Sequence, residues 1–145
     1  MNIFRFTDNY EFLSNFYECI IIYEGKEYKS VEHVYQAYKS LNESEREWIR
    51  TAPTATLAKS FGRKIKIRKD WDNVKYNLML DFIRIKFKNP ELKELLLKTG
   101  NDKLIEGNYW HDNIWGDCHC NKCKNIKGLN WLGEILMTVR EEIKK

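Results

Sequence analysis

The chain has 145 residues, 43% of them apolar and 14% aromatic, which is enough for the core of a single compact domain. Its 25 basic and 21 acidic residues leave a formal charge of +4, spread along the sequence, which suits a phosphate-bearing ligand as well as nucleic acid. No apolar run approaches the roughly 20 residues of a membrane span, and the N-terminus lacks the charged and then apolar order of a signal peptide. Three of the four cysteines lie between positions 118 and 123, which argues against a secreted disulfide framework. We therefore expect a cytoplasmic protein that does not contact a membrane.

The first part of the chain has the pattern of β structure. Residues 3–6 resemble a short strand, and residues 19–28, with Glu24-Gly25 at their centre, predict an antiparallel hairpin with a two-residue turn. Between them, residues 11–17 combine aromatic rings with polar side chains. A ligand-binding loop and a packed turn would both have this composition.

A short helix is predicted after the hairpin, with Ser30 as its N-cap. Val31, Val34 and Tyr38 recur at the three- and four-residue spacing that turns one face of a helix to a core. Glu32 lies in the first turn, where free N–H groups and the helix dipole favour a negative charge, so it should stay ionised unless burial opposes it. An ionised carboxylate can activate water or face a developing cation. A first-turn acid without a function is the alternative, because such acids occur on most helices.

Five further helices are predicted from capping residues and from apolar positions three or four residues apart. They cover residues 42–49, 53–62, 70–88, 90–100 and 130–144. We expect Gly62 to close the second of them and Asp70 to cap the third, which is the longest. The apolar stripe of this longest helix consists of Trp71, Val74, Leu78, Phe82 and Ile85. The fold class is therefore α+β, a mostly helical single domain over residues 1–145 with a small N-terminal antiparallel β element.

Two segments between the helices have compositions that suit ligand binding. Residues 62–69 place five cations within eight residues, which predicts a phosphate clamp or a solvated charged loop. Residues 106–123 have neither helical nor strand periodicity, and they concentrate two tryptophans, a tyrosine, three carboxylates, two histidines and three thiols. Aromatic faces suit a heterocyclic base, and carboxylates suit the positive charge that builds on a sugar carbon when its bond to a base breaks. Trp71 would be a further wall of such a pocket or, as is common for large rings at helix starts, part of the core.

The three thiols at C-x-C-x2-C spacing are candidate metal ligands. Cys118, Cys120 and Cys123, with His119 between them or His111 before them, could form a tetrahedral structural zinc site. The spacing is not that of a paired C-x2-C set, so reduced cysteines in a basic loop are the alternative.

Several short motifs follow one another in a characteristic order along nearly the whole chain. They are Phe12-Leu13-Ser14-Asn15-Phe16, Ser30-Val31-Glu32-His33 with Gln36-Ala37, Gly62-Arg63, Arg68 with Trp71, Lys86-Phe87, Trp115-Gly116-Asp117, and Asn130 with Leu132-Gly133. In this order and spacing they resemble the NADAR family, which is named for NAD and ADP-ribose. The resemblance implies a mostly helical α+β domain that hydrolyses N-glycosidic bonds. It implies phosphoribosylated riboflavin-pathway intermediates or ADP-ribose on a base as substrates, whereas composition and spacing alone indicate only a pocket for a base and a sugar.

The resemblance also implies site residues. Glu32 and Asp117 match positions of catalytic carboxylates, and the division of roles between them stays open. Matching positions and the basic segment assign substrate contacts to Asn15, Arg63, Arg68, Trp71, Trp115 and Asn130. The sequence departs from the family pattern at residues 118–123, where simpler members are rich in glycine, so the insert bears on substrate choice.

We expect a metal-independent enzyme whose partner is a small phosphoribosyl or ADP-ribosyl compound, including ADP-ribose attached to nucleic acid. Two other functions remain compatible with the sequence. In the first, the cysteine cluster is a zinc knuckle of a nucleic-acid-binding module whose aromatic rings stack on unpaired bases. In the second, the protein binds ADP-ribose without cleaving it. Affinity for nucleic acid would fall steeply with salt, whereas turnover of a small substrate would change only modestly.

Overall fold

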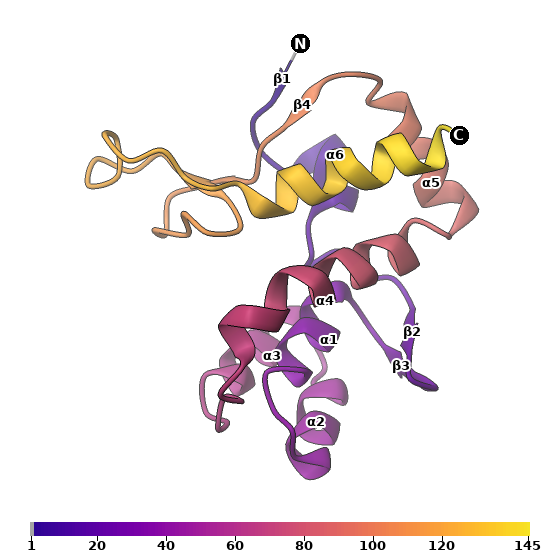
Figure 1. Cartoon of the computed structure of the whole chain (residues 1–145), viewed down its shortest axis with the longest axis vertical. Helices are drawn as coiled ribbons and strands as arrows, with labels where there is room; N and C mark the ends of the chain where they lie inside the picture. Colours follow the sequence, from indigo (N-terminus) through magenta and orange to yellow (C-terminus); the bar gives the residue numbers. More distant parts are fainter. Residues whose placement is uncertain (1) are drawn as a thin grey trace. The chain divides into compact units, whose positions relative to one another are not determined.

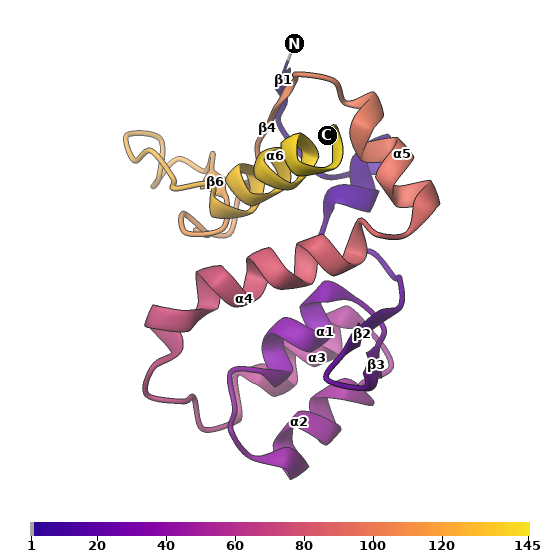
Figure 2. The ribbon, with the colours of Figure 1, turned by 45° about the vertical axis from the view of Figure 1, so that its right-hand side comes forward.

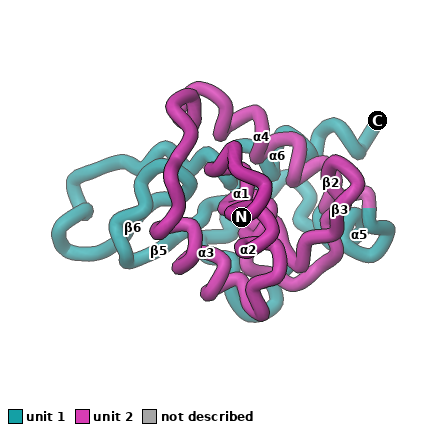
Figure 3. Tube along the Cα trace, turned by 90° about the horizontal axis from the view of Figure 1, so that it is seen from below, with its two compact units in different colours: residues 1–14, 89–145 teal, residues 15–88 magenta. Residues whose placement is uncertain are grey.

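The computed structural model describes residues 2–145, which divide into two compact units (Figure 3). We call residues 15–88 the Glu32 unit and residues 2–14 with 89–145 the Asp117 unit. Helices predominate in both units and the strands are short, so the expected α+β class is confirmed. None of the helices in residues 2–145 has the length and apolar character needed to cross a bilayer.

The Glu32 unit begins with the predicted hairpin. Strands β2 (Ile21–Tyr23) and β3 (Lys26–Tyr28) are antiparallel, with Ile21 opposite Tyr28. Both residues of the connecting turn have left-handed backbones, with φ of 49° at Glu24 and 80° at Gly25. Two positive φ angles are what a two-residue hairpin turn of the I′ type requires, so the sequence signal was correct.

Helix α1 (Val31–Ala37) starts where the sequence predicts. The Ser30 side chain accepts a hydrogen bond from the His33 N–H and caps the first turn. Our expectation that only one face of α1 is buried is wrong, because every residue of this helix is buried. α2 (Glu43–Arg50) and α3 (Ala55–Gly62) pack with α1 in this unit (Figure 2).

Glycine is required at position 62 for a different reason from the one we expected. It is the last residue of α3, and its backbone is not left-handed, so it does not end the helix by a left-handed turn. A Cβ at this position would lie 1.9 Å from Oε1 of Gln36. Glycine is needed here because α3 approaches the Gln36 side chain of α1 closely.

Helix α4 (Trp71–Lys86) is the longest helix, as predicted. Its buried positions differ from the predicted stripe and are Trp71, Met79, Phe82, Ile83 and Lys86, whereas Val74, Leu78 and Ile85 are only half-buried. Asp70 occupies the N-cap position of α4, as predicted, but its side chain makes no capping hydrogen bond. Its carboxylate is bound instead by the guanidinium group of Arg68.

In the Asp117 unit, β1 (Asn2–Ile3) pairs in parallel with β4 (Lys103–Leu104), far along the chain (Figure 1). The expected strand at residues 3–6 is therefore shorter than predicted. The 3₁₀ helix η1 (Asp8–Leu13) follows and overlaps the start of residues 11–17, where we expected a ligand-binding loop or a packed turn. α5 (Pro90–Lys98) begins at the predicted residue and ends two residues before the predicted end, and the Asn89 side chain caps it.

The remaining part of this unit carries the aromatic and thiol-rich loop. Two-residue strands β5 (Gly107–Asn108) and β6 (Asp117–Cys118) pair in parallel, and α6 (Trp131–Ile143) follows. The first N–H groups of α6 have no partner within the helix. Here they donate to the loop: Trp131 N–H to the Ile114 carbonyl and Leu132 N–H to the Trp115 carbonyl, both at 3.0 Å. The start of α6 thus fixes the backbone on either side of Trp115.

Candidate functional site

Glu32 is a buried carboxylate at the start of a buried helix. Its side chain is only 6% exposed, and its Oε2 accepts a hydrogen bond of 2.7 Å from Nε2 of Gln36, one turn further along α1. The Glu32 N–H donates to the carbonyl of Asn15 at 3.0 Å. The structure therefore brings together two of the predicted site residues, Glu32 and Asn15.

The Asn15 side chain adds an unpaired acceptor beside this helix start. It is 8% exposed, and its Oδ1 has no hydrogen-bond partner among residues 2–145. Its Nδ2 makes only a long contact of 3.6 Å to the sulfur of Met79. Because buried polar atoms are almost always hydrogen-bonded, Oδ1 is suited to accept a bond from a ligand hydroxyl or a water molecule.

Four cations gather near Lys39, which lies two residues after the end of the Glu32 helix. Burial lowers the pKa of Lys39, and the negative charge of Glu32 opposes this shift. Lys59, Arg63 and Lys75 lie close enough to lower the pKa of Lys39 further by repulsion. We call Lys39, Lys59, Arg63 and Lys75 the cation group. Lys75 is paired with Asp72 at 3.0 Å. Lys39, Lys59 and Arg63 therefore provide the excess of positive charge, which favours an anionic ligand.

The two predicted arginines have different surroundings. Arg63 is exposed at the C-cap of α3 and belongs to the cation group. Arg68 forms two hydrogen bonds to the Asp70 carboxylate, of 2.6 and 3.0 Å. This pairing lowers the pKa of Asp70, so the charge of Arg68 is already compensated. The predicted contact of Arg68 with a phosphate stays a prediction.

Trp71 is 7% exposed and packs against Tyr35 of α1, with ring centroids 5.2 Å apart. The ammonium group of Lys39 lies 5.4 Å from the centre of the same tyrosine ring. Trp71 is thus part of the core next to the cation group. Its predicted contact with a substrate base is not tested by this geometry.

In the Asp117 unit, hydrogen bonds and ring packing hold the two predicted site residues of the loop, Trp115 and Asp117. The Trp115 N–H donates to the Asp112 carboxylate at 2.9 Å, and the Trp115 ring meets Trp131 edge to face at 5.6 Å. The Gly128 N–H donates to Oδ1 of Asp117 at 2.9 Å. Trp115 and Asp117 therefore lie on a loop with fixed geometry.

Asp117 lines a shallow cavity of about 400 Å³. The other walls include His119 and the two lysines Lys124 and Lys127. The Nε2 atom of His119 lies 4.0 Å from Oδ2 of Asp117. A carboxylate among lysines at an open cavity can interact with the hydroxyl and phosphate groups of a sugar phosphate.

Asn130 is buried, and its amide group already has two partners. Its Oδ1 accepts from the Glu106 N–H and its Nδ2 donates to the Leu104 carbonyl, both at 2.9 Å. Its backbone is left-handed, with φ of 52°. The side chain holds the start of α6 to the segment after β4, and its predicted contact with a substrate stays a prediction.

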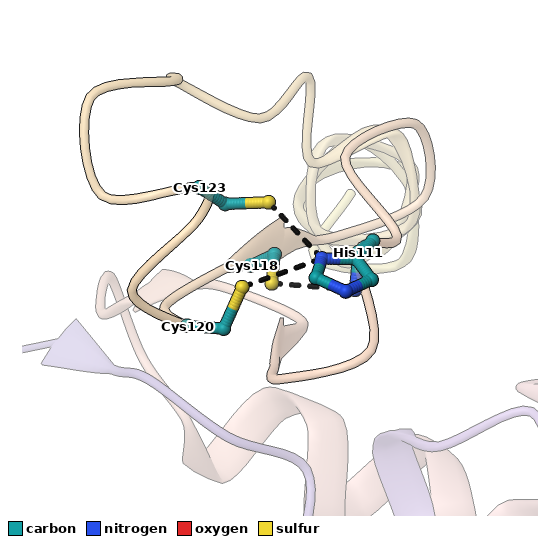
Figure 4. Close-up of side chains that lie close together, drawn as sticks. All are labelled: His111, Cys118, Cys120 and Cys123. Atoms are coloured by element: carbon teal, nitrogen blue, oxygen red, sulfur yellow. Dashed lines mark hydrogen bonds between the residues drawn. The ribbon is translucent and has the colours of Figure 1, made fainter.

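Four of the side chains in the loop could hold a metal ion. They are His111, Cys118, Cys120 and Cys123, whose ligand atoms all lie within 4.8 Å of one another (Figure 4). The sequence left the choice between two histidines open. In the structure His111 joins the thiols, whereas His119 lies beside Asp117.

Sequence reasoning missed three of the four cations, Lys39, Lys59 and Lys75. One signal was available for Lys39, which follows Glu32 by seven residues, the spacing of two helical turns, although α1 itself ends at Ala37. Lys59 and Lys75 come from α3 and α4, and no local pattern links either of them to Glu32.

A family model for the NADAR domain matches residues 3–144, and the chain belongs to this family. An N-glycosidase YbiA of Shigella boydii is 38% identical over 99% of this chain and 88% of its own length. A riboflavin biosynthesis protein of Vibrio vulnificus is 36% identical over 95% of this chain, which spans only 37% of that larger protein. The NMR structure of YbiA of Escherichia coli superposes with a TM-score of 0.84 at 37% identity, covering 99% of this chain and 84% of that one.

Proposed function

We propose that this protein is an N-glycosidase that hydrolyses the bond between a sugar carbon and a nitrogen of a base. Membership of a family whose relatives are named N-glycosidases supports this reaction class. The observation that carries the proposal for this chain is the buried carboxylate of Glu32, which lies within electrostatic range of Lys39, a member of the cation group. Packing of an apolar core does not require a buried carboxylate near several cations. Cleavage of an anionic glycoside would use the carboxylate at the sugar carbon and the cations at the phosphate.

Glu32 would accept a proton from the attacking water. As the bond from the sugar carbon to the base nitrogen breaks, positive charge builds on the sugar, and the carboxylate stabilises that charge. Water then adds its oxygen to the sugar carbon, and the base leaves with the bonding electrons and gains a proton. The hydrogen bond from Gln36 to Oε2 of Glu32 holds the carboxylate in one orientation.

The cation group would bind the phosphate of the substrate. Its members carry the positive charge that a phosphoribosyl or ADP-ribosyl compound requires, and Arg63 can make paired hydrogen bonds to phosphate oxygens. The unpaired Oδ1 of Asn15 would accept a bond from a sugar hydroxyl or from the nucleophilic water. We assign Asp117 to the sugar as a second carboxylate, as its motif position implies, and Trp71 and Trp115 to the base.

We propose phosphoribosylated riboflavin-pathway intermediates as the first substrate class, because one relative is named a riboflavin biosynthesis protein. ADP-ribose on a small base or on nucleic acid is the second class. The hydrolysis requires no cofactor in this scheme, since a carboxylate and water suffice. A metal in the cysteine cluster would be structural.

A panel of N-glycosides tests the proposal. Purified protein is incubated with phosphoribosylated pyrimidines, free ADP-ribose, NAD and ADP-ribosylated oligonucleotides, and mass spectrometry follows the released base and sugar phosphate. We expect stoichiometric release of both products from at least one phosphorylated glycoside, with weak dependence on salt. Tight binding without release would identify a binder, and binding of unmodified nucleic acid that falls steeply with salt would identify a nucleic-acid module.

A further inference from the structure

The cluster of His111, Cys118, Cys120 and Cys123 has nearly the dimensions of a tetrahedral metal site (Figure 4). Zinc binds sulfur at about 2.3 Å and imidazole nitrogen at about 2.0–2.1 Å, which places neighbouring ligand atoms about 3.6–3.8 Å apart. In the structure Nδ1 of His111 lies 3.3 Å from Sγ of Cys120 and 3.4 Å from Sγ of Cys123. Shifts of a few tenths of an ångström in these two pairs would reach the required spacing.

We propose that this chain binds one zinc ion through these four residues and that the ion fixes the loop that carries Trp115 and Asp117. Three cysteines with one histidine form a common ligand set of structural zinc. A site with four protein ligands leaves no position for water, so the ion takes no part in hydrolysis. The inference concerns the folding of the loop and does not depend on the proposed activity.

The groups next to the ligands suit bound thiolates. The His111 N–H points to Sγ of Cys118 at 3.3 Å, and Nδ2 of Asn113 points to Sγ of Cys123 at 3.4 Å. The Oδ1 atom of Asn113 also accepts from the Cys118 N–H at 2.8 Å. Such N–H donors stabilise negative sulfur atoms and orient the ligands of a zinc site. His111 has a left-handed backbone, with φ of 69°, which is uncommon for a residue other than glycine.

Hydrogen bonds hold this loop, but little apolar packing supports it. Strands β5 and β6 have two residues each, and Trp110, Ile114 and Ile126 of the surrounding segment are exposed. A segment with so little buried apolar surface has low local stability. A zinc ion that joins residue 111 to residues 118–123 would close the loop around Trp115 and Asp117, because binding energy at a structural site is folding energy.

The two histidines make the proposal testable. His119 lies one residue from two of the thiols, but its ring lies at the edge of Tyr109 and beside Asp117. Protein expressed with zinc and purified without chelator should contain about one zinc per chain by elemental analysis. His111→Ala and Cys120→Ser should each lose most of it, whereas His119→Ala should retain it.

Cys19→Ser is the matched cysteine control, because Cys19 lies in the other unit, outside the cluster. It should retain about one zinc per chain. Metal-free protein, bound iron in place of zinc, or loss of zinc in His119→Ala with retention in His111→Ala would each overturn the assignment.

Cobalt substitution keeps the test independent of variants that fail to fold. The wild-type protein with cobalt in place of zinc should show the intense visible bands of a tetrahedral centre and a thiolate-to-cobalt charge-transfer band in the near ultraviolet. Removal of the metal should speed hydrogen exchange in residues 107–128 and leave α1 unchanged. An octahedral cobalt spectrum would refute the site, and unchanged exchange would refute its structural role.

Discussion

The replacement Glu32→Gln tests the proposed mechanism most directly. Glutamine keeps the shape of the side chain, and its amide oxygen can still accept the hydrogen bond that Gln36 Nε2 donates at 2.7 Å. The variant loses the negative charge and the ability to take a proton from water. We therefore expect the fold to be preserved, with a change in Tm below about 4 °C, which corresponds to about 1 kcal/mol for a chain of this size.

The expected loss of activity follows from two effects. A carboxylate about 4 Å from a unit positive charge contributes about 4 kcal/mol at an effective dielectric constant of about 20, and an oxocarbenium-like transition state realises part of this. General base catalysis contributes about 10²- to 10⁴-fold. We expect kcat of Glu32→Gln to fall at least about 100-fold, or about 2.7 kcal/mol, with KM nearly unchanged because the charge matters most in the transition state.

The assay is steady-state release of base, measured by chromatography, with thermal unfolding of the same samples. Glu45→Gln is the matched control, because Glu45 also lies in the first turn of a helix but is half-buried at most and outside the proposed site. Its kcat should equal that of the wild type. Near-normal kcat in Glu32→Gln, or loss of its fold, would show that Glu32 is a structural partner and that the mechanism is wrong.

Three further outcomes are expected. Arg63→Ala should raise KM about tenfold with little change in kcat, and Arg68→Ala should raise it less because its guanidinium is already paired; steady-state kinetics would refute this if Arg68→Ala had the larger effect. Burial lowers the pKa of His33 below 6.5 in the folded chain. As the pH falls below about 6.5, the unfolded chain therefore binds a proton that the folded chain does not bind, and the free energy of unfolding decreases. Urea titrations should show a slope of up to about 1.4 kcal/mol per pH unit, which His33→Gln should remove. Gly62→Ala should destabilise the fold by about 1–3 kcal/mol and lower kcat, because a Cβ 1.9 Å from Oε1 of Gln36 displaces the group that orients Glu32; unchanged urea midpoints would contradict the close packing.

A double variant tests whether Glu32 and Asp117 act on the same reaction step. If Glu32 and Asp117 serve the same transition state, the double variant Glu32→Gln with Asp117→Asn should lose far less activity than the product of the two single losses. Strictly multiplicative losses would show that they act independently, and Asp117 would then lose its proposed catalytic role.

The local part of this structure was predictable from the sequence. The hairpin turn at Glu24-Gly25 and the helix caps Ser30 and Asn42 are where the pattern places them. Each depends on interactions within a few residues, such as a side-chain oxygen that accepts from a backbone N–H two or three positions later. Asn42 and Glu45 have the spacing of a capping box, in which each side chain binds the other residue's N–H. Only the bond from the Glu45 N–H to Asn42 forms, because the Glu45 carboxylate accepts from the Ser40 hydroxyl instead.

The tertiary structure decided the rest. Burial of α1 on all sides depends on the helices around it, and the need for glycine at position 62 depends on a side chain 26 positions earlier, so neither has a local signal. The same holds for the pairing of β1 with β4 and for the cation group, whose members lie just after α1, in or just after α3, and in α4.

The metal ligands show most clearly what the sequence predicts and what depends on the tertiary structure. Spacing alone identified the three thiols and two candidate histidines, because all lie within one short segment of the chain. Which histidine faces the thiols depends on the path of the backbone, and the left-handed turn at His111 brings its ring to them while β6 carries the side chain of Asp117 toward His119. Composition and spacing determined which chemical groups this protein has, and only the folded backbone determined which of them meet, since contacts between distant residues leave no trace in a local pattern.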